Sequence, residues 1–163
     1  MKNLYLVRHA KAEKIGFGQN DFHRELSNEG HTDAPRLARI IGTEIQKPDL
    51  IVSSTALRAL STARYFAEVF NIEEEDIVHE PEIYEASART LLSVINNLDN
   101  SKNNIMLFGH NPGFTYIAEY LTKAEIGDLP TCGIVQLSFD TDNWAELSNG
   151  TGSVVKKWFR EEE

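Results

Sequence analysis

Short apolar runs alternate with longer segments of helical periodicity along this chain. Runs typical of β-strands occupy residues 4–7, 50–52, 105–108, 134–139 and 154–159, with a weaker run near 77–78. Apolar residues spaced three and four apart predict helices that include 34–45, 57–70, 91–98 and 114–121. Ser27 precedes the first of these segments and Ser87 the third, and serine is suited to cap a helix N-terminus. Because strands alternate with helices, the pattern favours an α/β sheet.

The last two apolar runs are connected differently from the others. Residues 140–152 are rich in Asn, Asp and Gly, and they are too few for a crossover helix with its loops. We therefore expect these two runs to pair as an antiparallel hairpin, which makes an otherwise parallel sheet mixed. No internal repeat, low-complexity tract or linker interrupts the sequence, so we expect a single domain over residues 1–163.

The composition narrows the class of protein. Hydrophobic residues make up 41% of the chain and charged residues 25%, near the averages of globular domains. No apolar run approaches the ~20 residues of a membrane span, and the run at 4–7 is shorter than the ~7–15 residues of a secretory core. We therefore expect a cytoplasmic protein without a membrane partner. The net charge of −9 argues against general binding to nucleic acid, which relies on clustered Lys and Arg.

Cysteine usage excludes two kinds of site. A single cysteine, Cys132, allows neither an internal disulfide nor a cysteine-based metal cluster. The residue is better explained as a small buried side chain than as a reactive thiol.

Basic side chains follow three of the predicted strands. Arg8 and His9 follow the first run, Arg58 closes the stretch 53–58 after the second, and His110 follows the run at 105–108. Ligands of open α/β sheets bind just outside the carboxyl ends of the strands, so we expect these side chains to meet at one edge. Guanidinium groups hold phosphoryl oxygens in two-point contacts, and an imidazole can attack phosphorus. The set therefore predicts a phosphoryl-transfer site.

Each of these residues has a simpler interpretation when it is taken alone. A histidine at a strand end is more often a structural residue than a nucleophile, and Arg8 and Arg58 could be charges at a rim. His110 could mark a strand-to-helix connection, because Pro112 suits the first turn of a helix. The functional interpretation rests on the combination, because every simpler interpretation would have to hold at the same edge.

Four stretches of the sequence match motifs of a known family. They read LVRHAKAE at 6–13, FHRELSNEGHTDA at 22–34, SSTALRALSTA at 53–63 and FGHNPG at 108–113. Together they resemble the histidine phosphatase superfamily, and specifically its short SixA-like phosphohistidine phosphatase branch. The resemblance implies a mixed, mostly parallel α/β sheet flanked by helices on both faces, of the phosphoglycerate-mutase-like type. It also implies catalysis through a covalent phosphohistidine.

The resemblance gives each strand-end residue a role. It implies that His9 is the nucleophile, that Arg8 and Arg58 hold the phosphoryl oxygens, and that His110 donates to the same group. The family usually has glycine after the Arg-His pair, whereas this chain has Ala10. A methyl group disfavours positive φ, so we expect the backbone after His9 to adopt a conformation that alanine tolerates.

This chemistry requires a neutral His9. Its reference pKa of ~6.5 leaves the imidazole mostly neutral at pH 7, and we expect two nearby arginines to lower that pKa further. We also expect the other ring nitrogen to bond a backbone carbonyl, which fixes the tautomer. The cationic side chains supply the charge that a Mg²⁺ ion would bring, so we expect neither a metal nor another cofactor.

Two further residues are candidates for the site. Glu85 is the candidate general acid, although a solvated carboxylate at the start of a helix explains it equally well. Arg24 is a candidate for substrate binding, with a surface ion pair to Glu25 or Glu29 as the alternative. Weaker candidates for supporting roles are Lys11, Ser54 and Asn111.

The spacing of the chain also bears on the substrate. There is room for one helix between Tyr84 and Asn104, and none for an inserted cap over the site. An open site suits a phosphate carried on a protein surface, and an imidazole leaving group needs little acid catalysis. We therefore expect a phosphohistidine-bearing protein as the substrate.

Three alternatives are open at this point. The same site could serve a small-molecule phosphomonoesterase or, less readily, a phosphoglycerate-mutase-like transferase. The pocket could also bind a phospholigand without turning it over. A metal site on His23 and His31 is the weakest alternative, because their spacing is poor and no carboxylate accompanies them.

Overall fold

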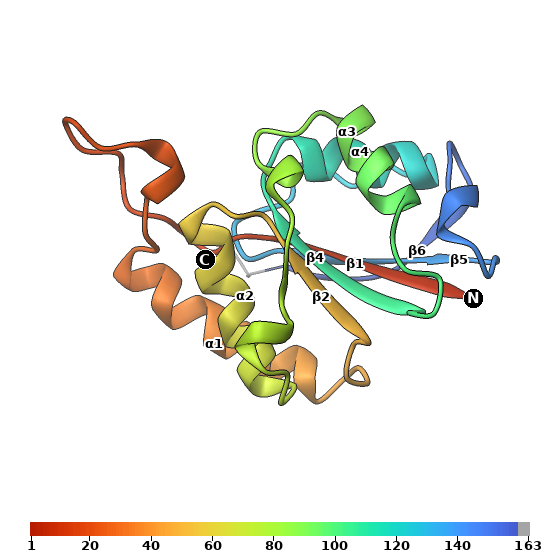
Figure 1. The fold of residues 1–163 in the computed structure, drawn as a ribbon, viewed down its shortest axis with the longest axis horizontal. Coiled ribbons are helices and arrows are strands. Elements are labelled where there is room, and N and C mark those ends of the chain that lie inside the picture. The colour runs from red at the N-terminus through yellow and green to blue at the C-terminus, as the bar shows by residue number, and fades with distance from the viewer. Residues whose placement is uncertain (160–163) are drawn as a thin grey trace.

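A six-stranded sheet lies between two pairs of helices in the computed structural model, which describes residues 1–159 (Figure 1). Every predicted strand is confirmed, including the weak one near 77–78. The order across the sheet is β3-β2-β4-β1-β5-β6. The strands are β1 (Lys2–Arg8), β2 (Leu50–Ser53), β3 (Val78–His79), β4 (Asn104–Gly109), β5 (Ile134–Phe139) and β6 (Gly152–Trp158).

The sheet is mixed, as the connection lengths predicted. β4 pairs in parallel with both β1 and β2, and β2 pairs in parallel with β3. β5 runs antiparallel to β1, and β6 runs antiparallel to β5, which confirms the C-terminal hairpin. The connection between β5 and β6 contains the short 3-10 helix η4 (Trp144–Glu146).

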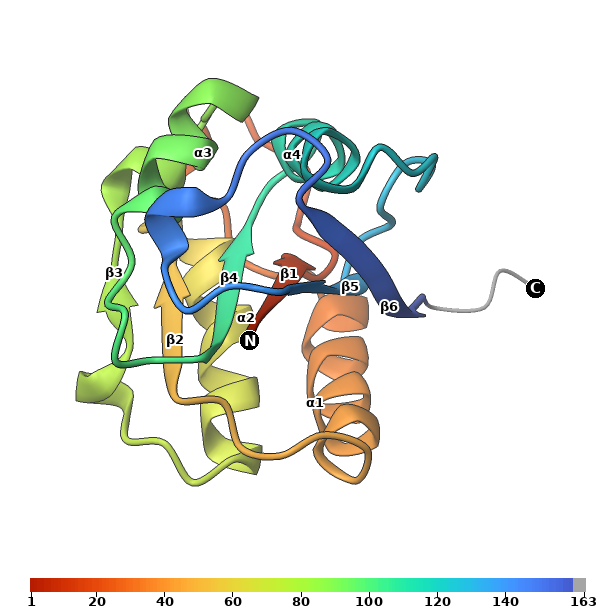
Figure 2. The ribbon, with the colours of Figure 1, turned by 90° about the vertical axis from the view of Figure 1, so that its right-hand side faces the viewer.

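Two α-helices cover each face of the sheet (Figure 2). α1 (Asn28–Gly42) and α2 (Leu57–Val69) lie on one face, and α3 (Ala88–Asn96) and α4 (Gly113–Thr122) lie on the other. No helix within residues 1–159 has both the length and the apolar composition that a membrane crossing would require.

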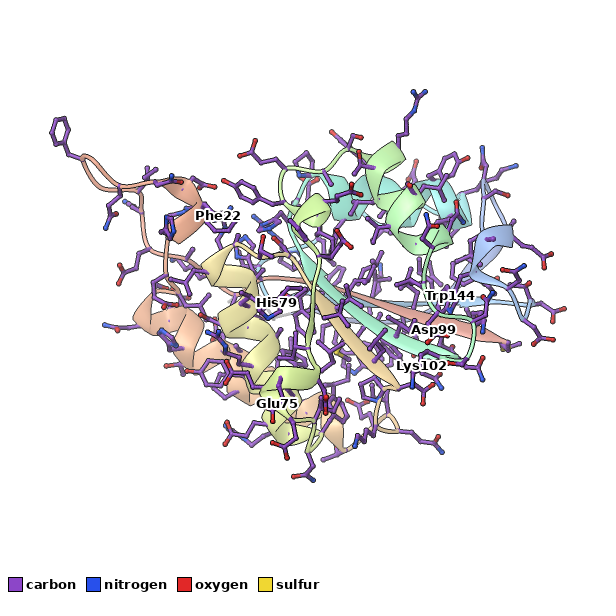
Figure 3. All side chains as sticks on the ribbon, viewed as in Figure 1. Phe22, Glu75, His79, Asp99, Lys102 and Trp144 are labelled. Atoms are coloured by element: carbon purple, nitrogen blue, oxygen red, sulfur yellow. The ribbon has the colours of Figure 1, made fainter. Side chains whose placement is uncertain are left out.

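Burial on both faces follows from the alternation of side chains along the central strands. One face of β1 and β4 packs under α3 and α4, together with the fully buried Trp144 of η4. The opposite face of these strands packs against α1 and α2. In Figure 3, Trp144 lies toward one end of the molecule, and Phe22 of the 3-10 helix η1 (Asp21–His23) lies toward the other end. The residues that divide the two strands between the faces are as follows. The first face carries Leu4, Leu6, Ile105 and Leu107, and the second carries Tyr5, Val7, Met106 and Phe108.

The helix starts are capped where serine was expected. The Ser27 hydroxyl accepts a hydrogen bond from the Gly30 N–H at 3.1 Å, and the Ser87 hydroxyl accepts one from the Thr90 N–H at 3.3 Å. Each cap satisfies one backbone donor that the first turn of a helix leaves without an intrahelical partner. The two caps therefore fix where α1 and α3 begin.

The first turn of α1 packs tightly against the segment that follows His9. The Ser27 N–H donates to the Lys11 carbonyl at 2.9 Å, and Ala12 pairs with Leu26 in an isolated bridge. A Cβ atom added to Gly30 would lie 2.1 Å from the Lys11 carbonyl oxygen. Glycine at position 30 therefore lets the segment after His9 lie against α1.

We expect Gly30→Ala to lower the free energy of unfolding by about 2–3 kcal/mol, because the new methyl would overlap backbone that cannot move independently. Urea unfolding measures this change. Gly16→Ala is the matched control, because its Cβ would meet the flexible side chain of Gln19, and we expect a change within about 0.5 kcal/mol. Equal losses in the two variants would contradict the close packing of α1 on the segment after His9.

Candidate active site

The pairing of β1 with β4 brings two histidines together. The register places Arg8 opposite Gly109, so the next residue of each strand, His9 and His110, leaves the sheet at the same edge. Their ring centroids lie 5.3 Å apart. The structure thus joins two predicted site residues that are about a hundred positions apart in the sequence.

His9 is held by both its backbone and its ring. Its N–H donates to the Gly109 carbonyl at 3.0 Å, and its carbonyl accepts from the Cys132 N–H at 3.0 Å. Ring atom Nδ1 lies 2.6 Å from the Ala10 carbonyl, and a carbonyl can only accept, so Nδ1 carries the proton. Nε2 therefore keeps its lone pair, as expected for a nucleophile. Cys132 is buried, as predicted.

The alanine that replaces the usual glycine fits this backbone. Ala10 is fully buried, and its N–H donates to the Thr62 hydroxyl at 3.0 Å. It does not belong to the residues of positive φ in the described chain. The Thr62 hydroxyl in turn donates to the Arg58 carbonyl at 2.8 Å, so the backbone after His9 is tied to the first turn of α2.

His110 shares a hydrogen bond with Ser54. His110 Nε2 lies 2.8 Å from the Ser54 hydroxyl oxygen, and the same oxygen accepts the Ala56 N–H at 3.2 Å. With one lone pair in use, the hydroxyl can donate its proton to Nε2, which leaves the ring proton on Nδ1. The supporting role expected of Ser54 is thus a hydrogen bond to His110.

Arg8 is anchored from the loop before β5. Its Nη1 donates to the Leu129 carbonyl at 3.0 Å. Asn111 Nδ2 donates to the same carbonyl at 2.8 Å, while its Oδ1 accepts from the Thr115 N–H and hydroxyl. Asn111 therefore fixes the oxygen that anchors Arg8.

Asp21 links the other two predicted arginines. Arg58 donates through Nη1 to the Asp21 carbonyl at 2.8 Å and through Nη2 to Asp21 Oδ2 at 3.0 Å. Arg24 Nη2 lies 3.1 Å from Asp21 Oδ1, so Arg24 pairs with this carboxylate in place of Glu25 or Glu29. Both guanidinium groups are thus held by one acid that the sequence reasoning did not single out.

Tyr84 is the second functional residue that was missed. Its hydroxyl donates to Asp21 Oδ2 at 2.6 Å, and its ring lies edge-to-face on His110 with centroids 5.6 Å apart. The ring of Phe22, which is labelled in Figure 3, also lies edge-to-face on Tyr84, with centroids 5.3 Å apart. One weak signal was present, since Tyr84 directly precedes the candidate acid Glu85.

The structure places Glu85 on the surface beside Tyr84. Its backbone is left-handed, with φ of 56°, and its side chain is exposed. The hydrogen bond to Asp21 and burial raise the pKa of the Tyr84 hydroxyl, and the Glu85 carboxylate adds to this effect. The role of Glu85 as a general acid stays a prediction.

The remaining candidates make other contacts. Lys11 is paired with Glu29 at 2.8 Å on the surface. His31 Nδ1 lies 2.8 Å from the Tyr65 hydroxyl, and His23, the last residue of η1, lies edge-to-face on Phe22. Within residues 1–159, no three His, Cys, Asp or Glu side chains are grouped so as to hold a metal ion.

Four buried nitrogens at the site have no hydrogen-bond partner within residues 1–159. They are the Nε atoms of Arg8, Arg24 and Arg58 and the Nδ1 atom of His110. Each such atom costs about 1–3 kcal/mol if it stays unpaired. All four belong to residues predicted for the site, and all can donate. Acceptor oxygens, such as those of a phosphoryl group, are the partners that these donors lack.

Both histidines are neutral over the physiological range. The pKa of His9 is lowered to about 4, mainly by burial and also by the charges of Arg58, Arg8 and Arg24, whereas the hydrogen bond to Ala10 opposes the shift. The expected direction is confirmed, but burial is a larger cause than the arginines. Burial also lowers the pKa of His110 to about 3, with His9 and Arg58 adding to the effect.

These two histidines should make the protein sensitive to mild acid. Their folded pKa values lie below the ~6.5 of an unfolded chain, so the unfolded state binds more protons between about pH 4 and 6.5. The free energy of unfolding should therefore fall as the pH is lowered, by about 2 kcal/mol for each histidine between pH 7 and pH 5. Urea unfolding at both pH values tests this. In His110→Gln, the decrease in the free energy of unfolding between pH 7 and pH 5 should be about half of that in the wild type. An equal decrease in both proteins would contradict a lowered pKa of His110.

Comparison with known sequences agrees with the chemistry of the site. The family described as histidine phosphatase superfamily (branch 1) matches residues 4–91. An uncharacterized chloroplastic protein of Arabidopsis thaliana is 30% identical over 155 residues, which cover 89% of this chain and 70% of that protein.

Solved structures share the fold over nearly the whole chain. A protein assigned as phosphohistidine phosphatase SixA from Agrobacterium tumefaciens is 30% identical, with a TM-score of 0.83 and 98% of each chain covered. The protein histidine phosphatase SixA complexed with tungstate has the same fold at 18% identity, with a TM-score of 0.79 and 95% of each chain covered. A mycobacterial glucosyl-3-phosphoglycerate phosphatase also shares the fold at 16% identity, with a TM-score of 0.66 and coverage of 94% of this chain and 96% of that one. Since the family covers more than half of the sequence and the relatives extend over most of it, the chain belongs to the histidine phosphatase superfamily and is a histidine-dependent phosphatase.

Proposed function

We propose that this phosphatase removes the phosphoryl group from phosphohistidine on a protein, through a covalent intermediate on His9. One observation carries the proposal: four unpaired buried donors accompany a neutral imidazole whose Nε2 keeps its lone pair. Three guanidinium groups and one imidazole N–H match an anion with several oxygens, and the neutral ring supplies the nucleophile.

In the first step, His9 Nε2 attacks phosphorus in line with the departing group. The bond from phosphorus to Nε2 forms as the bond to the leaving atom breaks, and the electron pair goes to that atom. Negative charge on the equatorial oxygens is held by Arg8, Arg24, Arg58 and His110. The proton of His9 stays on Nδ1, and its hydrogen bond to the Ala10 carbonyl stabilises the positive charge that develops on the ring.

In the second step, water attacks the phosphohistidine and releases inorganic phosphate. The same donors stabilise the oxygens, and His9 leaves in the tautomer in which it started. The three arginines supply the positive charge that phosphoryl transfer needs, so we expect activity without an added metal ion.

The surroundings of the site favour a phosphate that is carried on a protein. Between Tyr84 and β4 the chain forms α3 and its loops, and α3 packs on the sheet rather than over the site. The segment 13–20, next to η1, exposes the apolar side chains of Ile15 and Phe17. Figure 1 shows this segment projecting from the body of the molecule, where a bound protein could cover it.

Relatives support two substrate classes. The SixA structures are named for phosphohistidine, whereas the mycobacterial neighbour acts on glucosyl-3-phosphoglycerate. The second class, a small phosphomonoester, is the alternative, and Glu85 beside Tyr84 is the observation that favours it. We also propose a cytoplasmic location for this chain, although its Arabidopsis relative is described as chloroplastic.

Brief exposure to ³²P-phosphoramidate should label the protein with an acid-labile, base-stable phosphate, because a phosphohistidine has this stability. His9→Ala should abolish the label, whereas His79→Ala, which removes an exposed histidine of β3, should keep it. Denaturing gels after acid and base treatment measure the outcome. An unlabelled wild type without turnover would support a protein that binds phosphate but does not hydrolyse it.

Glu85→Gln separates the two substrate classes. If the protein acts on phosphohistidine, we expect less than about a threefold fall in kcat/KM for a phosphohistidine protein, because imidazole departs without acid catalysis. A fall of about 100-fold on an alkyl phosphate alone would identify Glu85 as the acid of a phosphomonoesterase. Glu82→Gln is the matched control, since Glu82 is an exposed carboxylate three residues earlier.

A further inference from the structure

We propose that Asp21 selects the leaving group: its carboxylate accepts the N–H of a protonated imidazole that departs from the phosphoryl group. The inference rests on the proposed function and assigns a specificity-determining role to a residue outside the family motifs quoted above. It concerns the edge of the pocket formed by Asp21 and Tyr84, hereafter the acceptor edge.

Asp21 is linked to both histidines of the site through Tyr84. Asp21 bonds Arg58 and Tyr84, and Tyr84 packs on His110, which packs on His9. The Asp21 side chain is 40% exposed, whereas that of Arg58, its partner, is 7% exposed. The carboxylate therefore reaches solvent, whereas the guanidinium that it binds is buried beside the two histidines.

The Asp21 carboxylate has a free position at which it can accept a further hydrogen bond. A carboxylate offers about four acceptor positions. Arg58 and Tyr84 occupy Oδ2, and Arg24 lies 3.1 Å from Oδ1. Oδ1 can thus accept one more N–H from a bound molecule.

Asp21 is ionised and Tyr84 keeps its proton. The hydrogen bond from Tyr84 and the charge of Arg58 hold the pKa of Asp21 below its usual range, so the group is an anion near neutral pH. The same hydrogen bond raises the pKa of the Tyr84 hydroxyl, which keeps its proton. The acceptor edge therefore accepts a hydrogen bond without taking up the proton, and it is poorly suited to donate a proton to an alkoxide.

Positive and negative side chains lie on different sides of the expected phosphoryl position. Arg8, Arg24 and Arg58 surround the place where phosphoryl oxygens would bind, whereas Asp21 carries a negative charge on one side of it. The exposed Glu85 adds a second negative charge near Tyr84. A phosphohistidine protonated on its free ring nitrogen has the complementary pattern, with an anionic phosphoryl group and a cationic ring.

The reaction balances without a further reagent. The phosphorus–nitrogen bond of the substrate breaks, its electron pair goes to the leaving nitrogen, and phosphorus bonds to His9 Nε2. The proton stays on the other nitrogen of the leaving ring, held by Asp21 Oδ1, and neutral imidazole departs. Asp21 favours the protonated substrate, which is the reactive form.

The test compares two small substrates with the full-length enzyme. Phosphoimidazole has the N–H that Asp21 would accept, whereas p-nitrophenyl phosphate releases a weakly basic phenolate that has no such group. Asp21→Asn should lower kcat/KM about 30-fold for phosphoimidazole and less than about fivefold for p-nitrophenyl phosphate. The smaller loss reflects the weakened support of Arg58 and Arg24.

The pH dependence of kcat/KM distinguishes two roles of Asp21: binding the N–H of the leaving imidazole, and holding Arg58 and Arg24 in place. In the wild type, the carboxylate should keep phosphoimidazole protonated at higher pH, and in Asp21→Asn the alkaline limb for this substrate should move down by about one unit. The charged or titratable groups that face Asp21 are Arg24, Arg58, Tyr84 and His110. They are present whichever substrate is bound, so their titration would affect both pH profiles. The limb for p-nitrophenyl phosphate should therefore stay in place.

Two further variants serve as controls. Asp21→Glu keeps the charge and should recover part of the preference for phosphoimidazole. Asp128→Asn removes an exposed carboxylate near Arg8 instead, and it should leave the ratio of the two substrates within about twofold.

One measurement on the wild type does not depend on the variants folding. Imidazole should inhibit hydrolysis of p-nitrophenyl phosphate more strongly below its own pKa than above it, because the cation binds Asp21. Equal inhibition by imidazole below and above its pKa would overturn the proposal. Equal losses on both substrates in Asp21→Asn, with unmoved pH limbs, would also overturn it and leave the proposed function standing. A wild type that turns over neither substrate would overturn both.

Discussion

The parallel pairing of β1 with β4 is the contact on which the site depends. It sets Arg8 opposite Gly109, and as a result the two histidines that follow leave the sheet together. The ladder continues one step beyond the strands, through the hydrogen bond from the His9 N–H to the Gly109 carbonyl. Because both strands are buried on both faces, this register cannot slip without exposing the core. The position of the nucleophile is therefore fixed by the same packing that stabilises the fold.

Burial gives the site its reactivity at a cost to stability. Two imidazoles and three guanidinium groups lie close together, and each is partly or largely removed from water. The histidines respond by staying neutral, which leaves His9 able to attack. The arginines stay charged and keep one donor each without a partner. Such unpaired donors persist in a stable protein when the fold as a whole holds them in place.

Asp21 offsets part of this positive charge at one edge. It joins η1 to α2 and to the loop before α3, three segments that the sheet alone does not bring into contact. The site thus combines three guanidinium groups with one carboxylate that is paired with two of them.

The sequence by itself determined the elements and four members of the site. Alternation of apolar residues is a local property, so the strands, the helices and the caps at Ser27 and Ser87 could be predicted from neighbours along the chain. Arg8, His9, Arg58 and His110 could be placed because strand ends of a parallel sheet share an edge. The tertiary structure decided which groups meet there. Tyr84 lies 63 residues from Asp21 and Arg58 lies 37 residues from it, and no local pattern encodes such contacts. Burial, which sets the charge of His9, is likewise a property of the folded chain, because it depends on every segment packed around the ring.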